Sequence, residues 1–282
     1  METKLAIIAG GGPLPGYLIE ACKSSGREYF VLAFKGQAEI EVVDDSPHSW
    51  VRLGALESSL KLLRKHKCRE LVLAGSIKRP TLYQLRPDFK AAKFLSKGIL
   101  NKGDDGILKE IIKYLENEGF KIVGADEVVK GLCATSGPIG KFTTTDVDEA
   151  DIVIGVNVVR QIGKLDLGQA AIIRNGNVLA IEAADGTQAM LNRCISLSRS
   201  SKGGVLVKLP KPNQEQRVDM PTIGPSTVRA VSDAGLSGIV IAAEKTIVIE
   251  ADKVSRAANS AGIFVVGINP DDYIVGYNNL LR

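Results

Sequence analysis

A long irregular stretch of the sequence, residues 207–225, carries side chains suited to a phosphate ester. Its cations Lys208, Lys211 and Arg217 can neutralise a diphosphate, and several prolines stiffen the chain around them. One aspartate, Asp219, accompanies them and suits Mg²⁺ or the orientation of an attacking water. Composition alone also allows a solvated loop in which Asp219 pairs with Arg217.

A glycine-rich turn near the start is the second candidate. Gly10, Gly11 and Gly12 follow an apolar run and precede a helical pattern, and such a turn lets backbone amides approach a phosphate closely. The dinucleotide fingerprint is absent, because Pro15 takes its third glycine position and residues 35–37 lack the acid that would hold a ribose. We therefore expect a nucleotide or its phosphates here rather than NAD. A tight turn without a ligand is the simpler alternative.

Two aspartates, Asp104 and Asp105, stand at the start of a predicted helix. Aspartates in this position commonly cap free amides and complement the helix dipole. Contact with a ribose or a metal ion is the functional alternative.

A third polar group, Glu182 to Thr187, ends a predicted strand and opens a helix. Helix capping by Asp185 or Thr187 explains part of it. Carboxylates at the carboxyl end of a strand also occupy the place where α/β proteins build their sites. We therefore include Asp185, Gly186 and Thr187 among the candidate substrate-binding residues.

Apolar runs alternate with helical patterns through the first half of the chain. This alternation predicts an α/β fold whose N-terminal part, residues 1–132, is a Rossmann-like parallel-sheet domain that binds a nucleotide or phosphate. The predicted strands are residues 5–9, 29–34, 71–74 and 121–123, and the predicted helices are residues 14–25 and 106–118.

Small and helix-breaking residues at 131–140 predict a domain linker. Beyond it, Asn175-Gly176 between two apolar runs is a strong hairpin signal, so at least one strand pair is antiparallel. We expect residues 138–282 to form a second, mixed α/β domain that carries the catalytic residues. Its predicted helices are residues 148–162, 188–197 and 225–234, and its predicted strands are 170–174, 178–182, 205–209 and 239–243.

The bulk composition excludes several classes of protein. The chain has 282 residues, 45% of them hydrophobic, and a formal net charge of +4, which is too mild to indicate nucleic-acid binding. The cysteines, at positions 22, 68, 133 and 194, have no metal-site spacing and suggest a reducing compartment. The Met-Glu-Thr-Lys start is not a signal peptide, and no apolar run approaches the ~20 residues of a membrane span. We therefore expect a cytoplasmic protein.

Residues 86–102 form a basic and apolar segment. Lys90, Lys93 and Lys97 fall on one helical face, and apolar surface comes from Phe89, Phe94, Leu95, Ile99 and Leu100. Such a segment can lie on an anionic bilayer at the inner face of the inner membrane. An ordinary surface helix whose apolar side belongs to the core has the same pattern.

Several motifs together resemble the LpxI family of UDP-2,3-diacylglucosamine pyrophosphatases of lipid A biosynthesis. The resemblance runs over about residues 4–270 and is most specific at residues 218–225, Val-Asp-Met-Pro-Thr-Ile-Gly-Pro. Gln188 departs from the family pattern, which has an acidic residue at that position, so we assign no metal ligand there. The other matching stretches are residues 7–15, 103–105, 167–170, 182–187 and 204–208.

The resemblance implies a hydrolase from a Gram-negative host that uses Mg²⁺. It implies cleavage of the diphosphate of UDP-2,3-diacylglucosamine to UMP and 2,3-diacylglucosamine 1-phosphate (lipid X), with Asp219 as the catalytic residue and the candidate metal ligand. The remaining candidate substrate-binding residues are Gly10, Gly11, Gly12, Asp104, Asp105, Asp185, Gly186, Thr187, Lys208, Lys211, Arg217, Thr222 and Gly224.

Other functions stay open at this point. A non-catalytic protein that binds nucleotide sugars has the same phosphate-binding features, and a nucleotide-dependent oxidoreductase is disfavoured only by the missing ribose acid. A homodimer and a peripheral membrane contact are also open.

Overall fold

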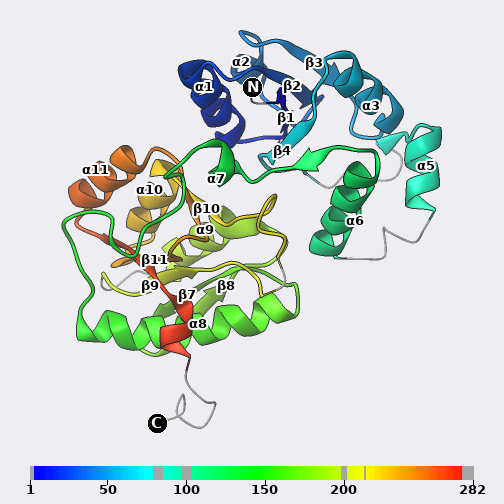
Figure 1. Ribbon diagram of the computed structural model, residues 1–282. Coiled ribbons are helices and arrows are strands. Elements are labelled where there is room, and N and C mark those ends of the chain that lie inside the picture. Colours follow the sequence, from blue (N-terminus) through cyan, green and yellow to red (C-terminus); the bar gives the residue numbers. More distant parts are fainter. Residues whose placement is uncertain (1–2, 79–84, 97–102, 198–201, 213, 275–282) are drawn as a thin grey trace. The chain divides into compact units, whose positions relative to one another are not determined.

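The computed structural model describes residues 3–78, 85–96, 103–197, 202–212 and 214–274 (Figure 1). The chain forms two compact units. The first contains residues 1–130 and a short return segment, residues 215–219, and the second contains residues 131–214 and 220–282. The return segment belongs to the first unit although the chain on both sides of it belongs to the second.

The first unit is built on a five-stranded sheet. Its strands are β1 (Leu5–Ala9), β2 (Tyr29–Phe34), β3 (His48–Val51), β4 (Glu70–Ala74) and β5 (Lys121–Ile122). Its helices are α1 (Leu14–Ser25), α2 (Ile40–Val43), α3 (Leu56–Lys65), α5 (Phe89–Leu95), α6 (Asp104–Asn117) and α7 (Ala125–Val128).

The strands of this sheet follow the order β3-β2-β1-β4-β5, and all neighbours are parallel. Doubly wound nucleotide-binding sheets share this order in their first five strands. Ala6 shares one face with Leu60 of α3 and Leu115 of α6 in a single core cluster. Ile7 points to the opposite face, where α1 packs on β1, so helices cover both sides of the sheet (Figure 1).

The second unit is built on a six-stranded sheet and a separate two-stranded one. Its strands are β6 (Gly137–Pro138), β7 (Ala170–Arg174), β8 (Asn177–Ile181), β9 (Val205–Lys208), β10 (Thr222–Ile223), β11 (Gly238–Ala242), β12 (Ile247–Val248) and β13 (Phe264–Ile268). Its helices are α8 (Asp146–Lys164), α9 (Gly186–Leu197), α10 (Pro225–Asp233), α11 (Ala251–Ala261) and the 3₁₀ helix η2 (Pro270–Tyr273).

The six-stranded sheet has the order β6-β13-β11-β9-β7-β8. Its central strands β13, β11 and β9 are parallel, whereas β6, β7 and β8 pair in antiparallel fashion. Helix α8 covers one face with Ile152 and Val156, and α9, α10 and α11 cover the other (Figure 1). Gly155 lets α8 approach closely, because a Cβ at this position would collide with Val207 of β9.

Local signals explain why these elements form. The Thr145 hydroxyl caps α8 in a capping box with Asp148. The predicted hairpin is β7–β8, with Asn175 and Gly176 at positive φ of 49° and 77°. The buried carboxylate of Asp151 accepts the amides of both turn residues, at 2.9 and 2.7 Å.

The predicted α/β class is confirmed, with a parallel sheet first and a mixed sheet second. The stretch expected to be a linker, residues 131–140, is ordered within the second unit. The Ala134 amide donates to Thr246 O and the Ile139 amide donates to Val265 O, because β6 adds to the edge of the sheet at β13. No helix in the part of the chain that the structure describes is long and apolar enough to cross a membrane.

Candidate active site

The return segment is held in the first unit by Arg217. Its guanidinium donates to both carboxylate oxygens of Glu215, at 2.9 and 3.1 Å, and to Glu116 of α6 at 2.7 Å. The hydrogen bond from Arg217 lowers the pKa of Glu215, and the two carboxylates raise the pKa of Arg217. Arg217 therefore holds the segment against α6. The sequence also allowed an ion pair between Arg217 and Asp219, but the partners of Arg217 are Glu116 and Glu215.

Asp219 ends the return segment and is half-buried. Its amide donates to Glu215 O at 3.0 Å, and the preceding Val218 packs into the apolar core of the first unit. Both residues line a cavity of about 640 Å³ in this unit, and Asp219 is the single carboxylate among the described lining residues. The segment thus presents one acid to an otherwise largely apolar space.

The glycine turn lies beside the same cavity, which Gly10 lines. The Gly10 amide donates to Ala74 O and the Gly11 amide to Ser76 O, each at 2.8 Å, and the Ser76 amide returns a bond to Gly11 O. A Cβ at Gly10 would lie 2.5 Å from Ser76 O, so the approach of the β1 and β4 ends requires glycine. The amides of Gly10 and Gly11 are engaged within the protein, and Gly12 has a positive φ of 86°.

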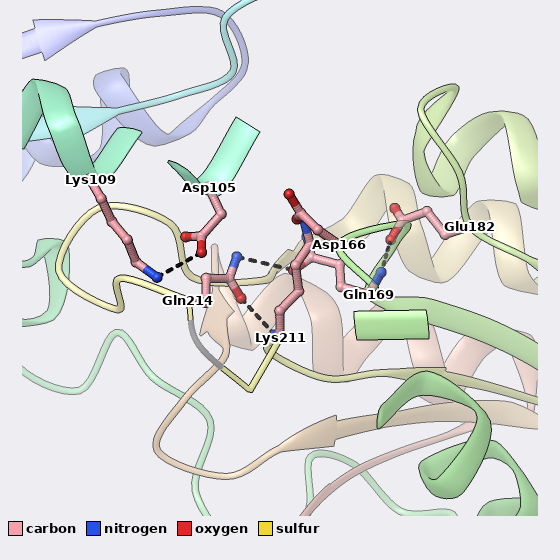
Figure 2. Close-up of polar contacts among 7 residues, drawn as sticks. All are labelled: Asp105, Lys109, Asp166, Gln169, Glu182, Lys211 and Gln214. Carbon is pink, nitrogen blue, oxygen red and sulfur yellow. Dashed lines mark hydrogen bonds and ion pairs between the residues drawn. The ribbon is translucent and has the colours of Figure 1, made fainter. Parts of the chain in front are cut away.

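Asp104 begins α6, as expected for a helix start, and nothing is described of its side chain. One oxygen of Asp105 accepts from Lys109 Nζ at 2.8 Å (Figure 2). Its other oxygen is buried and has no hydrogen-bond partner within the described residues. Asp105 therefore keeps one acceptor for a ligand donor or a cation.

The second unit contains a buried polar relay. Lys208 Nζ, at the end of β9, donates to the Thr187 hydroxyl at 2.6 Å, and that hydroxyl donates to Glu182 Oε1 at 2.5 Å. Glu182 Oε2 accepts the Gln169 amide at 2.9 Å (Figure 2). Lys208 is 7% exposed and Glu182 is 6% exposed, so two opposite charges are buried and joined through one hydroxyl.

Lys211 and its neighbours form a second polar group in this unit (Figure 2). Lys211 Nζ forms an ion pair with Asp166 at 2.6 Å, and its amide donates to the side chain of Gln214 at 2.9 Å. Gln214 in turn donates to the Gln169 side chain at 3.3 Å. The structure therefore connects Lys211 through two glutamines to the relay at Glu182.

The remaining candidates of the second unit take structural positions. Asp185 directly precedes α9 and pairs with Arg193, about two turns into that helix. Gly186 begins the helix at a positive φ of 82°. Thr222 begins β10 and donates to Met220 O at 3.2 Å. Gly224 is the N-cap residue of α10.

Sequence reasoning missed four residues that organise these groups: Glu116, Asp166, Gln169 and Gln214. Gln169 carried a signal, since it lies in the family-like stretch at residues 167–170 and directly precedes β7. Glu116 carried none, because its partner Arg217 is 101 residues away in the sequence.

The carboxylates of the described residues can form only part of a coordination shell for Mg²⁺, and oxygens of the substrate would have to supply the rest. No three His, Cys, Asp or Glu side chains gather around one point in the described ranges. Mg²⁺ is commonly held by one or two carboxylates together with substrate phosphates. Asp219 and Asp105 have carboxylate oxygens of the type that Mg²⁺ takes as ligands. The Gln188 side chain instead donates to the exposed Asn192 on α9.

The comparisons with known proteins cover nearly the whole chain. Residues 4–132 match the LpxI N-terminal domain and residues 135–266 match the LpxI C-terminal domain. The chain is similar to the UDP-2,3-diacylglucosamine pyrophosphatase LpxI of Caulobacter vibrioides, with 39% identity over 277 residues that span 95% of this chain and 99% of the relative. The resemblance predicted from the motifs is confirmed, and the chain belongs to the LpxI family.

Proposed function

We propose that this protein hydrolyses the diphosphate of UDP-2,3-diacylglucosamine to UMP and 2,3-diacylglucosamine 1-phosphate. The observation that carries the proposal is the position of Asp219, a single carboxylate on a clasped segment that lines an apolar cavity. A lipid-bearing phosphate ester has both a charged part and an apolar part. The similar protein from Caulobacter vibrioides is named as a pyrophosphatase of this substrate. The same proposal places the protein in the cytoplasm and the reaction in lipid A biosynthesis.

The reaction adds one water across the bridging P–O–P linkage, so one phosphorus gains the water oxygen and the other phosphate leaves. A diphosphate diester is doubly anionic and repels hydroxide. Catalysis therefore needs charge neutralisation and a positioned water. Carboxylates are weak bases at neutral pH, so we assign Asp219 to orient the water or hold a metal rather than to abstract a proton.

Two cations of the second unit are suited to the substrate's phosphates. The Lys208 ammonium is fixed by Thr187, and the Lys211 ammonium is fixed by Asp166. Fixed cations stabilise developing charge without the reorganisation that mobile ones need. Arg217 contributes differently, because Glu116 and Glu215 bind its guanidinium and its effect on the reaction passes through the position of Asp219.

Mg²⁺ is the cofactor that we propose. Asp219, and Asp105 through its unpaired oxygen, are the carboxylates of the first unit that would hold it. When bound, Mg²⁺ supplies positive charge to the diphosphate oxygens.

The test is the release of UMP from UDP-2,3-diacylglucosamine by the full chain with Mg²⁺, comparing the wild type with Asp219→Asn. We expect the variant to lose on the order of 10²-fold or more in kcat while substrate binding is largely retained. Asp252→Asn, an exposed aspartate on α11, is the matched control and should retain wild-type turnover. A wild type that binds the substrate but releases no UMP would instead identify a nucleotide-sugar-binding protein.

A further inference from the structure

Glu182 lies where three neighbouring strands of the six-stranded sheet end. Strands β9, β7 and β8 are adjacent in that order, and each runs antiparallel to the next. The end of β9 at Lys208 therefore lies beside the start of β7 at Ala170, its register partner. The Glu182 amide, just after β8, donates to Ala170 O at 2.8 Å. Glu182 and Lys208 thus flank β7 at the carboxyl edge of the parallel strands, where α/β proteins place their sites.

Both carboxylate oxygens of Glu182 are engaged inside the protein. Oε2 accepts the Gln169 amide at 2.9 Å (Figure 2), and Oε1 accepts the Thr187 hydroxyl at 2.5 Å. A Cβ at Gly168 would lie 2.2 Å from Glu182 O, so glycine lets the chain pass close enough to bring the Gln169 amide to this carboxylate. An acid held in this way suits a fixed negative charge better than a metal ligand or a general base.

The Thr187 hydroxyl gives the group a direction. A hydroxyl has one proton to donate and can accept hydrogen bonds as well. Because the Lys208 ammonium can only donate, the Thr187 oxygen accepts from Nζ at 2.6 Å and its own proton goes to Glu182. Thr187 lies in the first turn of α9, which fixes its position. The donors therefore run in one order, from the cation through the hydroxyl to the anion.

Burial makes the charge of Lys208 depend on its surroundings. Lys208 and Glu182 are both buried. Removal of an ammonium group from water disfavours its charged form, and an opposite charge nearby restores that form. A buried charge that loses its partner is costly, whereas a hydrogen-bonded pair is tolerated. Glu182 is the anion to which the structure connects Lys208.

The other charged groups that neighbouring elements bring to this edge pair among themselves or face solvent. Asp185 pairs with Arg193 of α9, and Asp166 pairs with Lys211. Glu244 follows β11 and is exposed, and the first turn of α10 is uncharged. Water screens exposed charges strongly, so they are weak partners for a buried one. Glu182 is therefore the group whose removal should change the state of Lys208.

From this arrangement we infer that Glu182 is a positioning residue of the reaction: through the Thr187 hydroxyl it holds the buried Lys208 ammonium in its charged form and in one orientation. This inference rests on the proposed function, which assigns Lys208 to the phosphates of the substrate. It adds that the cation acts as one member of a buried pair, and that Glu182 contributes without contacting the substrate.

The first experiment follows UMP release from about pH 6 to about pH 9. Glu182→Gln keeps the size of the side chain and removes its charge, so Lys208 should lose its proton within this range. We expect kcat/KM of the variant to fall about tenfold more than that of the wild type toward the alkaline end. Glu244→Gln removes an exposed charge and should follow the wild-type profile. A Glu182→Gln profile parallel to that of the wild type overturns the inference.

Arginine at position 208 tests whether charge is what Glu182 supplies. A guanidinium keeps its proton throughout this pH range. Lys208→Arg combined with Glu182→Gln should therefore lack the added pH dependence, and Lys208→Arg alone is the reference for the change of shape. A double variant that keeps the alkaline loss would show that Glu182 acts on something other than the charge at position 208, which contradicts the inference.

The charge of Lys208 is also measurable without hydrolysis, by NMR of protein whose lysines carry carbon-13 at Cε. The Lys208 resonance is identified by its absence from Lys208→Arg. We expect it to titrate at a lower pH in Glu182→Gln than in the wild type. Titration at the same pH in both proteins overturns the inference. An absence of UMP release while this difference persists would be a failure of the proposed function alone.

Thermal unfolding shows whether Glu182→Gln remains folded. If it does not, Thr187→Val takes its place, because it disconnects the two charges while leaving both in the protein. We expect the Lys208 resonance to titrate at a lower pH in Thr187→Val than in the wild type, and Thr187→Ser, which keeps the hydroxyl, to match the wild type. The same titration in all three proteins would overturn the inference.

Discussion

Lys208 and Thr187 come from different elements of the second unit and meet through a 2.6 Å hydrogen bond from the ammonium to the hydroxyl. The same hydroxyl donates to Glu182, so a single oxygen connects a buried cation to a buried anion. Thr187 lies at the start of α9 and Lys208 at the end of β9, which means that the helix start positions the cation.

Thr187→Val keeps the shape of the side chain and removes the shared hydroxyl from both charges. We expect the free energy of unfolding to fall by about 1–3 kcal/mol, the cost of an unsatisfied buried polar group. Thr187→Ser keeps the hydroxyl and should lose much less. Urea unfolding of the full chain measures both, and equal stability of the Val and Ser variants would show that the hydroxyl does not connect the charges.

Arg217→Gln should lower kcat more than it lowers stability. The side chains of Arg217 and Glu116 are 38% and 41% exposed, and such pairs contribute only about 0–1 kcal/mol to folding. Their release nevertheless frees the segment that carries Asp219. Glu116→Gln should reproduce a smaller part of the kcat loss with KM little changed, and Lys61→Gln, which breaks an exposed pair on α3, is the control.

The stability of the wild type should fall on acidification partly through Glu215. Because Arg217 lowers the pKa of this carboxyl below its ordinary 4.5, the folded state favours the charged form. The resulting stability is present above pH 4.5 and is lost as the pH falls through the lower folded value. Glu215→Gln lacks this contribution, so its deficit against the wild type should be largest at neutral pH and shrink below 4.5. A deficit that does not change with pH would show that the pair contributes no proton linkage.

Removal of divalent metal should abolish UMP release, and added Mg²⁺ should restore it. The diphosphate and the carboxylates of the first unit are both anionic, so a divalent cation is needed to bring them together. Asp105→Asn should raise the Mg²⁺ concentration needed for half-maximal rate, while Asp126→Asn, exposed on α7, should not. Full activity in excess EDTA would mean that lysines alone supply the charge.

The structure limits which residues of α5 can contact a membrane. Phe94 and Leu95 are half-buried and line the cavity instead of facing outward, whereas Phe89 is 81% exposed. Lys97, Ile99 and Leu100 lie outside the described residues. Lys90→Gln with Lys93→Gln should weaken co-sedimentation with anionic liposomes, as salt should for the wild type, without changing turnover of detergent-solubilised substrate. Unchanged co-sedimentation in both experiments would leave α5 as a wall of the cavity alone.

The periodicity of apolar residues predicted the main helices and strands, because the burial of these residues determines where such elements form. The run Leu5–Ala9 is apolar on both faces, and the turn Asn175-Gly176 has the residues that a tight hairpin demands, so both appear where expected. Short edge elements such as β6 and β10 were not predicted, since two residues carry no period. Their formation depends on partners that fold elsewhere in the chain.

The sequence predicted which types of residue belong to the site, but not which residues contact one another. The motif at Asp219 pointed to an acid, yet the anchor at Glu116 and the hydrogen bond from the Glu57 amide to Asp88 arise from contacts distant in the sequence. The cavity has no sequence signal at all, because it results from the spacing of helices whose leucines look like ordinary core residues. Family resemblance supplied the chemistry that composition left open.

The return segment places Asp219, encoded within the second half of the chain, in the fold of the first. Residues 215–219 join a unit that otherwise ends at residue 130. A gene that encoded only the first 130 residues would therefore produce the sheet and most of the cavity without the acid. Exchange of halves between distant relatives would also separate Arg217 from a matching Glu116. The two halves of such a chain must be inherited together, and Arg217 and Glu116 must change together.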